Sequence, residues 1–352
     1  MLRLRAMRKL LSTILFVSLA ATGCKKKESA PASEAKGSAT EPAGSGSGDG
    51  SAGSAAAPTP SPSERVAEAL KKAEADAAEE QKRWNDELKQ KVAALLEGTY
   101  KDTNEALTAI LASPHRVPSH PARDAARHPL ETLTFFGVSP ESTVVELGAG
   151  GGWYTELLAP LVANKGKLIV AGPDANGPAT EMSTVYGKRL DLFLAKSPEM
   201  FGKVQRVAIG SPDAIKLGDD GSADVVLAIR EMHGWQRRGV TDKYLAAVHA
   251  VLKDGGTFGV VAHRAAEGAK VEDTVEKGYL PEAWVIEQVE AAGFKLVEKS
   301  DINANPKDTK DYENGVWTLP PNLREGDTDR AKYEAIGESD RMTLKFQKVA
   351  KN

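Results

Sequence analysis

The sequence predicts an α/β domain over residues 100–352, with a mostly parallel sheet covered by helices on both faces. Short β-branched runs alternate there with helical segments, and no internal repeat is apparent. The first of these runs leads directly into a glycine-rich turn, as in sheets that bind ligands at the carboxyl ends of their strands. About 250 residues are also enough to form one large core.

The predicted elements follow one another in strand–helix order. Strands are expected at 143–147, 167–171, 204–209, 223–229 and 257–262, and two more at 295–299 and 342–347. Helices are expected at 153–162, 181–196, 241–252 and 281–292. The long polar segment 303–339 is either a lid or substrate wall or an inert surface insertion.

Residues 1–23 resemble the signal peptide of a bacterial lipoprotein. A positively charged start precedes an apolar run of about a dozen residues, too short for a bilayer span of roughly twenty. Small residues then precede Cys24, which is the only cysteine of the chain. The resemblance implies that Cys24 is lipidated and that the domain lies outside the cytoplasm, anchored to the bacterial cell envelope. An ordinary cleaved signal peptide with a chance cysteine is the alternative.

Two segments separate this signal from the domain. Residues 24–63 consist mostly of Gly, Ser, Ala, Pro and Glu, which bury too little apolar surface to fold, so a disordered tether is expected. Residues 64–98 are rich in Ala, Glu, Lys and Leu and predict one long charged helix. Its narrow apolar stripe suits either a solvated spacer or a coiled-coil partner site.

Composition excludes some functions. The formal net charge of -3 and a sequence pI near 6.2 argue against a nucleic-acid partner held by general electrostatics, which needs a clustered basic surface. A single cysteine and the lack of an H-x-x-x-H or C-x-x-C pattern give no metal signature. The sequence does not indicate an oligomeric state.

The stretch 144–155, VVELGAGGGWYT, carries the main chemical signal. Glycines at a strand–helix turn let the backbone approach a ligand and adopt positive φ. The dinucleotide fingerprint G-x-G-x-x-G would need glycine where Trp153 stands, which disfavours a nicotinamide oxidoreductase. The spacing present is G-x-G-x-G, with Glu146 two residues before the first glycine. A purely structural tight turn is the remaining alternative.

This stretch resembles motif I of the class I S-adenosylmethionine-dependent methyltransferases, which have a Rossmann-like fold. The strand SADVVLAI at 222–229 and the turn LKDGG at 252–256 resemble further segments of that family, in the same order. The resemblance implies S-adenosyl-L-methionine as cofactor and a mostly parallel seven-stranded sheet. It assigns cofactor binding to the following residues: Glu146, Gly148, Ala149, Gly150 and Gly152.

Two further acidic residues have cofactor roles by the same resemblance. Asp174 follows the second strand, where a carboxylate accepts hydrogen bonds from the ribose hydroxyls; the alternative is a turn cap. Asp213 follows the third strand and would face the adenine; the alternative is a helix cap. Beyond residue 114 the chain also resembles a family of predicted exported bacterial methyltransferases, through segments such as Arg123-Asp124, 151–155 and 262–265.

Residues that act on the methyl acceptor are expected in the loops after the fourth and fifth strands. His233 is a candidate base or substrate ligand, because its ordinary pKa lies near neutrality. His263 and Arg264 are expected to face the same cleft, and Arg264 would bind an acidic substrate or pair with a surface carboxylate. Either histidine is alternatively structural.

These observations lead to two hypotheses. The first is methyl transfer from S-adenosylmethionine to a small or envelope-associated acceptor. The absence of Asn/Asp-Pro-Pro-aromatic after Ile229 argues against methylation of DNA amino groups. The second is a non-catalytic lipoprotein that holds an adenosyl ligand or a partner on the same fold, because the cofactor is made in the cytoplasm.

Overall fold

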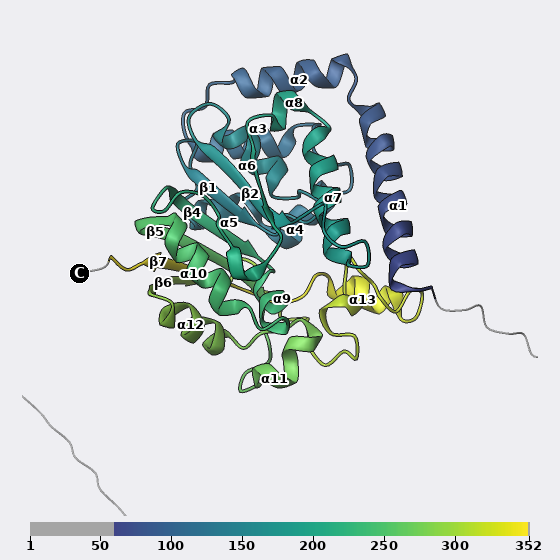
Figure 1. Ribbon diagram of the computed structural model, residues 1–352, viewed down its shortest axis with the longest axis vertical. Helices are drawn as coiled ribbons and strands as arrows, with labels where there is room; N and C mark the ends of the chain where they lie inside the picture. The colour runs from purple at the N-terminus through teal and green to yellow at the C-terminus, as the bar shows by residue number, and fades with distance from the viewer. Residues whose placement is uncertain (1–59, 351–352) are drawn as a thin grey trace, which may run out of the picture. The chain divides into compact units, whose positions relative to one another are not determined.

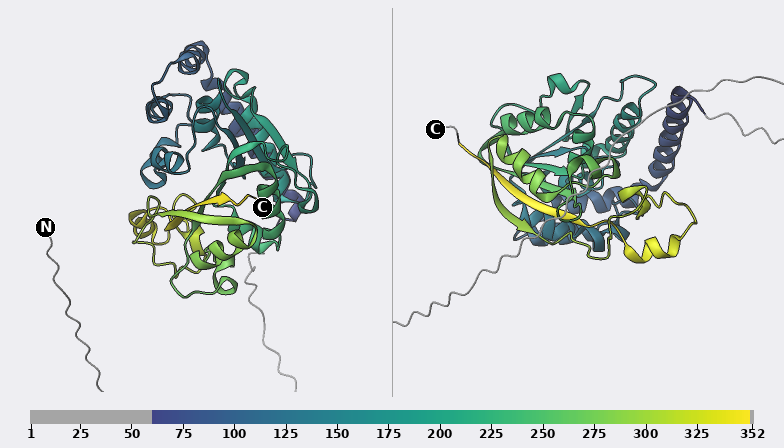
Figure 2. Two further views of the ribbon diagram at one scale, coloured as in Figure 1. Left: turned by 90° about the vertical axis from the view of Figure 1, so that its left-hand side faces the viewer. Right: turned by 90° about the horizontal axis from the view of Figure 1, so that it is seen from below.

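The structure is a computed structural model that describes residues 60–350. The predicted signal peptide, Cys24 and most of the predicted tether lie outside the described residues. In the described part of the chain, the centre is a seven-stranded sheet in the order β3-β2-β1-β4-β5-β7-β6 (Figure 1). Neighbouring strands from β3 to β5 are parallel, whereas β7 is antiparallel to both β5 and β6. In Figure 2 the yellow β7 runs beside the green β6.

All seven predicted strands are present. They are β1 (Thr143–Leu147), β2 (Lys167–Pro173), β3 (Gln205–Ile209), β4 (Ala223–Ile229), β5 (Leu252–His263), β6 (Phe294–Ser300) and β7 (Arg341–Lys348). The predicted helices are α6 (Thr155–Val162), α7 (Met182–Ala195), α10 (Thr241–Val251) and α12 (Glu282–Ala291). The predicted α/β architecture, a mostly parallel seven-stranded sheet with helices, is thus confirmed.

Helices cover both faces of the sheet because its central strands bury side chains on both sides. Val144 packs with one core and its neighbour Val145 with the other, and both are fully buried. The first face carries α3 (Thr103–Ala112), α5 (Pro129–Phe135), α6, α7 and α8 (Pro198–Phe201), and the second carries α9 (Met232–Arg237), α10 and α12. The remaining elements are α4 (Asp124–Arg127), α11 (Val271–Thr274), α13 (Arg330–Ile336) and the 3-10 turns Pro121–Arg123, Pro212–Ala214, Val275–Lys277 and Gly315–Thr318.

The predicted single helix at 64–98 is two helices, α1 (Pro62–Arg83) and α2 (Asp86–Glu97). The break falls at Asn85, whose side chain accepts a hydrogen bond from the amide of Leu88 and so caps α2. Trp84 and Val92 are buried in the core, and α1 packs against α7 (Figure 1). The segment therefore lies on the domain, which differs from the expected solvated spacer. Between residues 60 and 350, no helix combines the length and apolarity needed to cross a bilayer.

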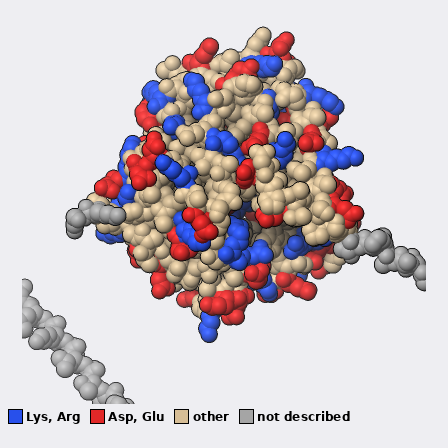
Figure 3. All heavy atoms as spheres, in the orientation of Figure 1, with Lys and Arg blue, Asp and Glu red and all other residues tan. Residues whose placement is uncertain are grey.

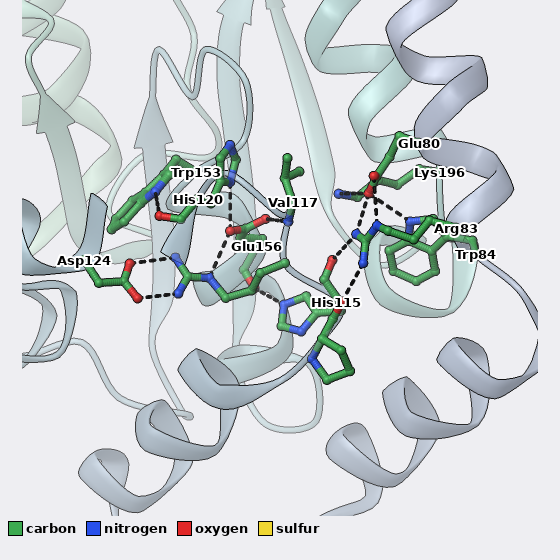
Figure 4. Close-up of polar contacts among 12 residues, drawn as sticks. Glu80, Arg83, Trp84, His115, Val117, His120, Asp124, Trp153, Glu156 and Lys196 are labelled. Atoms are coloured by element: carbon green, nitrogen blue, oxygen red, sulfur yellow. Dashed lines mark hydrogen bonds and ion pairs between the residues drawn. The ribbon is translucent and has the colours of Figure 1, made fainter. Parts of the chain in front are cut away.

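A buried polar network joins α6 to the segment before α4 (Figure 4). Glu156 of α6 is fully buried and accepts hydrogen bonds from Arg116 Nε at 3.0 Å and from the amide of Val117 at 3.1 Å. His120 Nδ1 lies 2.8 Å from the same carboxylate. Burial alone would raise the pKa of Glu156, but these hydrogen bonds and the charges of His120 and Arg116 lower it. Arg116 also forms a two-pronged ion pair with Asp124, at 2.6 and 2.8 Å.

We expect Glu156→Ala to lower the free energy of unfolding by about 3–5 kcal/mol, because it leaves the buried guanidinium of Arg116 short of an acceptor. Urea unfolding followed by circular dichroism measures this change. Asp76→Ala is the matched control, since its ion pair with Lys72 is exposed on α1, and it should have no measurable effect. Equal effects of the two substitutions would show that the network does not stabilise the fold.

Candidate functional site

A cavity of about 750 Å³ opens at the carboxyl ends of the central strands. It lies where the strand order reverses between β1 and β4, which is the place where open α/β sheets bind ligands. Figure 3 shows Lys and Arg atoms gathered near the middle of one face, over α9, beside a hollow. The lining comes from the turns after β1, β2, β3 and β4, from α7 and α9, and from Trp317 of the 303–339 segment.

The glycine turn after β1 forms one wall of this cavity. Gly148, Ala149 and Gly150 line it, as predicted for a ligand-binding turn. Gly148 has a φ of 64°, and a Cβ there would lie 2.0 Å from the carboxyl carbon of Glu231. Gly152 does not line the cavity; with a φ of 81° it lies where a Cβ would be 2.4 Å from the ring of Phe193. The close packing of Phe193 of α7 therefore explains why position 152 is glycine.

Glu146 lies inside the sheet beneath the glycine turn. It is only 3% exposed, and the Thr155 hydroxyl donates a hydrogen bond to Oε2 at 2.6 Å. Burial raises the pKa of Glu146 to about 7, since the ionised carboxylate would lose its water. It does not line the cavity, so any contact with a ligand depends on the overlying turn.

Glu231 is a site residue that the sequence analysis missed. It follows β4 and lines the cavity, with its carboxyl group against Gly148. Burial raises its pKa to about 8; Arg238 and Arg230 lower it, and the nearby Glu146 raises it. The signal available in the sequence was an acidic residue directly after the fourth strand, in the loop already considered for His233.

The two predicted aspartates are placed less favourably. Asp174 Oδ1 accepts a hydrogen bond from the amide of Asn176 at 2.9 Å, as in an Asx turn. Its preceding residues Gly172 and Pro173 line the cavity, but Asp174 does not. Asp213 is exposed and forms an ion pair with Lys243 at 2.5 Å. Neither side chain is among the lining residues, so their roles in binding ribose and adenine stay predictions.

The two predicted histidines lie together. The rings of His233 and His263 have centroids 5.6 Å apart, and Trp317 is 6.1 Å from His233. Burial, then the charges of Arg230 and Arg237, lowers the pKa of His233 to about 4. Burial and neighbouring positive charges also hold the pKa of His263 well below its ordinary value. Both imidazoles are therefore neutral at neutral pH, each with one unprotonated ring nitrogen, and their buried, positively charged surroundings oppose protonation.

His263 is oriented by a hydrogen bond between its Nδ1 and the hydroxyl of Ser339, at 2.5 Å. Its neighbour Arg264 has other partners. The guanidinium lies 3.0 Å from Asp301, and 3.7 Å from both Glu282 and Asp340. Neither Arg264 nor His263 lines the cavity, which differs from the expectation that both face it. The structure thus favours the surface-pairing alternative for Arg264.

Comparisons with known proteins add little to this geometry. No family model matches the chain, and no curated protein matches it. Among solved structures it is similar to a SAM-dependent methyltransferase from Aquifex aeolicus, at 16% identity over 65% of this chain and 94% of the other, with a TM-score of 0.43. A putative methyltransferase from Bacillus halodurans aligns at 14% identity over 64% of this chain and 100% of the other, with a TM-score of 0.42.

A third similar structure is 1,6-didemethyltoxoflavin-N1-methyltransferase from Burkholderia thailandensis, with bound 1,6-didemethyltoxoflavin and S-adenosylhomocysteine. It aligns at 16% identity over 72% of this chain and 93% of the other, with a TM-score of 0.39. At these values the likeness carries no argument about ligand or reaction. Within residues 60–350, no group of three or more His, Cys, Asp or Glu is arranged to hold a metal ion.

We expect the pH dependence of stability to report the two buried acids. Folding raises the pKa values of Glu146 and Glu231 to about 7 and about 8. Their contribution to the free energy of unfolding is therefore complete below the unfolded pKa of 4.5, and it is lost as the pH rises through the folded values. Glu231→Gln, which mimics the protonated acid, should therefore stabilise the protein relative to the natural chain more at about pH 8.5 than at about pH 5. Thermal unfolding across this range measures the difference.

The control for this comparison is Glu298→Gln on the exposed part of β6. Its unfolding curve should run parallel to that of the natural chain at every pH. If the Glu231→Gln curve were parallel too, the carboxyl group would not be held protonated in the folded protein.

Proposed function

We propose that the protein transfers a methyl group from S-adenosylmethionine to a small or envelope-associated acceptor. The observation that carries this proposal is the pairing of the Gly148 turn with the Glu231 carboxyl group inside a cavity of about 750 Å³. S-adenosylmethionine carries an ammonium and a sulfonium, and a cation bound beside the Glu231 carboxyl group would lower its raised pKa and favour the ionised form. The space that a side chain at Gly148 would fill is taken by the Glu231 carboxyl group, whereas the open surroundings of Gly150 leave room for close approach of the ligand to the backbone.

When bound, this cofactor supplies a methyl group on a sulfonium, which moves to the acceptor while the sulfur keeps the electron pair of the broken bond. The residues of this chain would then position the acceptor and receive its proton. His233 lines the cavity and is neutral, so it is the candidate base, with His263 behind it. Trp317 would limit access of water from the side of the 303–339 segment.

The first test is isothermal titration of S-adenosylmethionine and S-adenosylhomocysteine into the full-length protein. We expect micromolar affinity for both, and Gly150→Leu should weaken it at least about tenfold, a change of about 1.4 kcal/mol. Gly268→Leu is a matched control, because Gly268 has a similar positive φ, 75° against 58°, and equally open surroundings, but does not line the cavity.

Unchanged affinity in Gly150→Leu would mean that the ligand binds elsewhere. If folded natural protein bound neither nucleoside, the cofactor proposal would fail and the fold would serve another ligand or a partner. Binding without methyl transfer to any acceptor in a radiolabelled-methyl assay would support the non-catalytic alternative.

We also propose that the protein is a lipoprotein of the bacterial cell envelope, anchored through Cys24. The support is the sequence of residues 1–24 together with the Gly/Ser/Ala/Pro-rich stretch that follows. Growth with radiolabelled palmitate should label the natural protein, and Cys24→Ser should abolish the label. A retained label in Cys24→Ser, or no label in the natural protein, would contradict lipid anchoring.

A further inference from the structure

Four arginines from separate parts of the chain converge beside the cavity, and we call them the arginine cluster: Arg123, Arg127, Arg230 and Arg341. In the described part of the chain, every ion pair they form goes to one carboxylate, that of Glu338. The distances to Glu338 are 2.6 Å from Arg123, 3.0 Å from Arg341 and 3.4 Å from Arg127. Three guanidinium groups therefore share one carboxylate, and the fourth, that of Arg230, has no ion pair among residues 60–350.

The hydrogen-bonding capacity of the arginine cluster is incompletely used. Each member has one buried nitrogen without a hydrogen-bond partner among residues 60–350: Nη2 of Arg123, Nη2 of Arg127, Nε of Arg230 and Nε of Arg341. Arg127 and Arg341 are only 2% and 3% exposed. A buried donor without an acceptor is costly, more so when it is charged.

Arg116 provides a comparison within the same protein. It is as deeply buried as Arg127, but two carboxylates, Asp124 and Glu156, compensate its charge. This fold thus supplies a buried arginine with counter-charges where the role is structural. The arginine cluster lacks such compensation, so its excess charge calls for an anion from outside the chain.

Burial and mutual repulsion lower the pKa values of two members of the arginine cluster. Burial, then the charge of Arg230, lowers the pKa of Arg127 to about 8, against the attraction of Glu338. Burial also lowers the pKa of Arg230 to about 10, and the charges of Arg341 and Arg123 add to this. A bound anion would relieve this repulsion and raise both pKa values.

Arg230 brings this charge to the cavity wall. It lines the cavity, and its φ of 63° places it in the left-handed region, which is uncommon for residues other than glycine. Its amide donates to the carbonyl of Val261 at 2.7 Å, which joins the ends of β4 and β5. Strained backbone of this kind concentrates at binding sites.

Glu231 and Arg230 give the cavity a first region lined by a carboxyl group, which is largely protonated at neutral pH and would ionise beside a cationic ligand, and a second, basic region. The Glu231 carboxyl group lies against Gly148, whereas the charge of Arg230 acts on His233 and His263. A cationic part of a ligand is favoured at the first region and an anionic part at the second. The candidate base, His233, lies beside the second region, where an anionic part of the ligand would bind.

We propose that Arg230, backed by the rest of the arginine cluster, binds a carboxylate or phosphate group of the molecule that occupies the histidine side of the cavity. If the protein is the methyltransferase proposed above, its acceptor is an anionic molecule. This last step rests on the proposed function; the anion site itself does not.

Isothermal titration of inorganic phosphate and of malonate into the full-length protein, at low ionic strength, tests the anion site and separates phosphate from carboxylate ligands. We expect saturable binding of at least one, weakened at least about tenfold in Arg230→Gln and partly restored in Arg230→Lys. Arg330→Gln is the matched control, since Arg330 is exposed, paired with Glu334 and outside the cavity; the affinity should stay within about twofold. Circular dichroism verifies the fold of each variant.

Absence of saturable binding by the natural protein, or equal binding by Arg230→Gln, would overturn the anion site. A second titration with saturating S-adenosylhomocysteine identifies what the site is for. If the anion and S-adenosylhomocysteine bind at the same time, the result supports an acceptor site. If they compete, Arg230 holds the carboxylate of the nucleoside ligand, and the acceptor assignment is overturned. If the nucleoside does not bind at all, the proposed function fails, while the first titration still decides the anion site.

Discussion

The contact between the Glu231 carboxyl group and Gly148 is the constraint on which the rest of the site depends. Gly148 follows β1 and Glu231 follows β4, so the contact joins the ends of the two strands between which the order of the sheet reverses. Any side chain at position 148 would occupy the volume of that carboxyl group. The glycine turn thus holds an acid inside the cavity, where lack of water keeps it largely protonated near neutral pH.

Arg230, which precedes Glu231 in the chain, is basic and has different neighbours. Arg230 belongs with the arginine cluster and lowers the pKa of His233, whereas Glu231 belongs with the glycine turn. Two adjacent residues of the loop after β4 therefore give the cavity an acidic and a basic region. A molecule carrying both charges, or two molecules of opposite charge, would complement this arrangement better than a neutral apolar ligand.

The N-terminal part of the described chain helps to place the basic region. The Glu156 network fixes Arg116, which holds Asp124, the neighbour of Arg123. The indole of Trp153, next to the glycine turn, lies 5.4 Å from the guanidinium carbon of Arg116 and 4.6 Å from that of Arg127. The segment from 115 to 127 is therefore held between the glycine turn and the arginine cluster, and a disturbance of either should reach the other.

The sequence by itself determined the seven strands, the four main helices and the glycine turn, because alternation and turn chemistry act over a few neighbouring residues. It also placed His233 and His263 side by side, since parallel strands end at one edge of the sheet, although only His233 lines the cavity. Tertiary structure alone decided that α1 and α2 pack on the domain, and that Arg264 pairs with three carboxylates instead of lining the cavity. It alone brought Glu231 onto Gly148 and four distant arginines around Glu338, because such contacts depend on packing between segments as much as 218 residues apart, from Arg123 to Arg341.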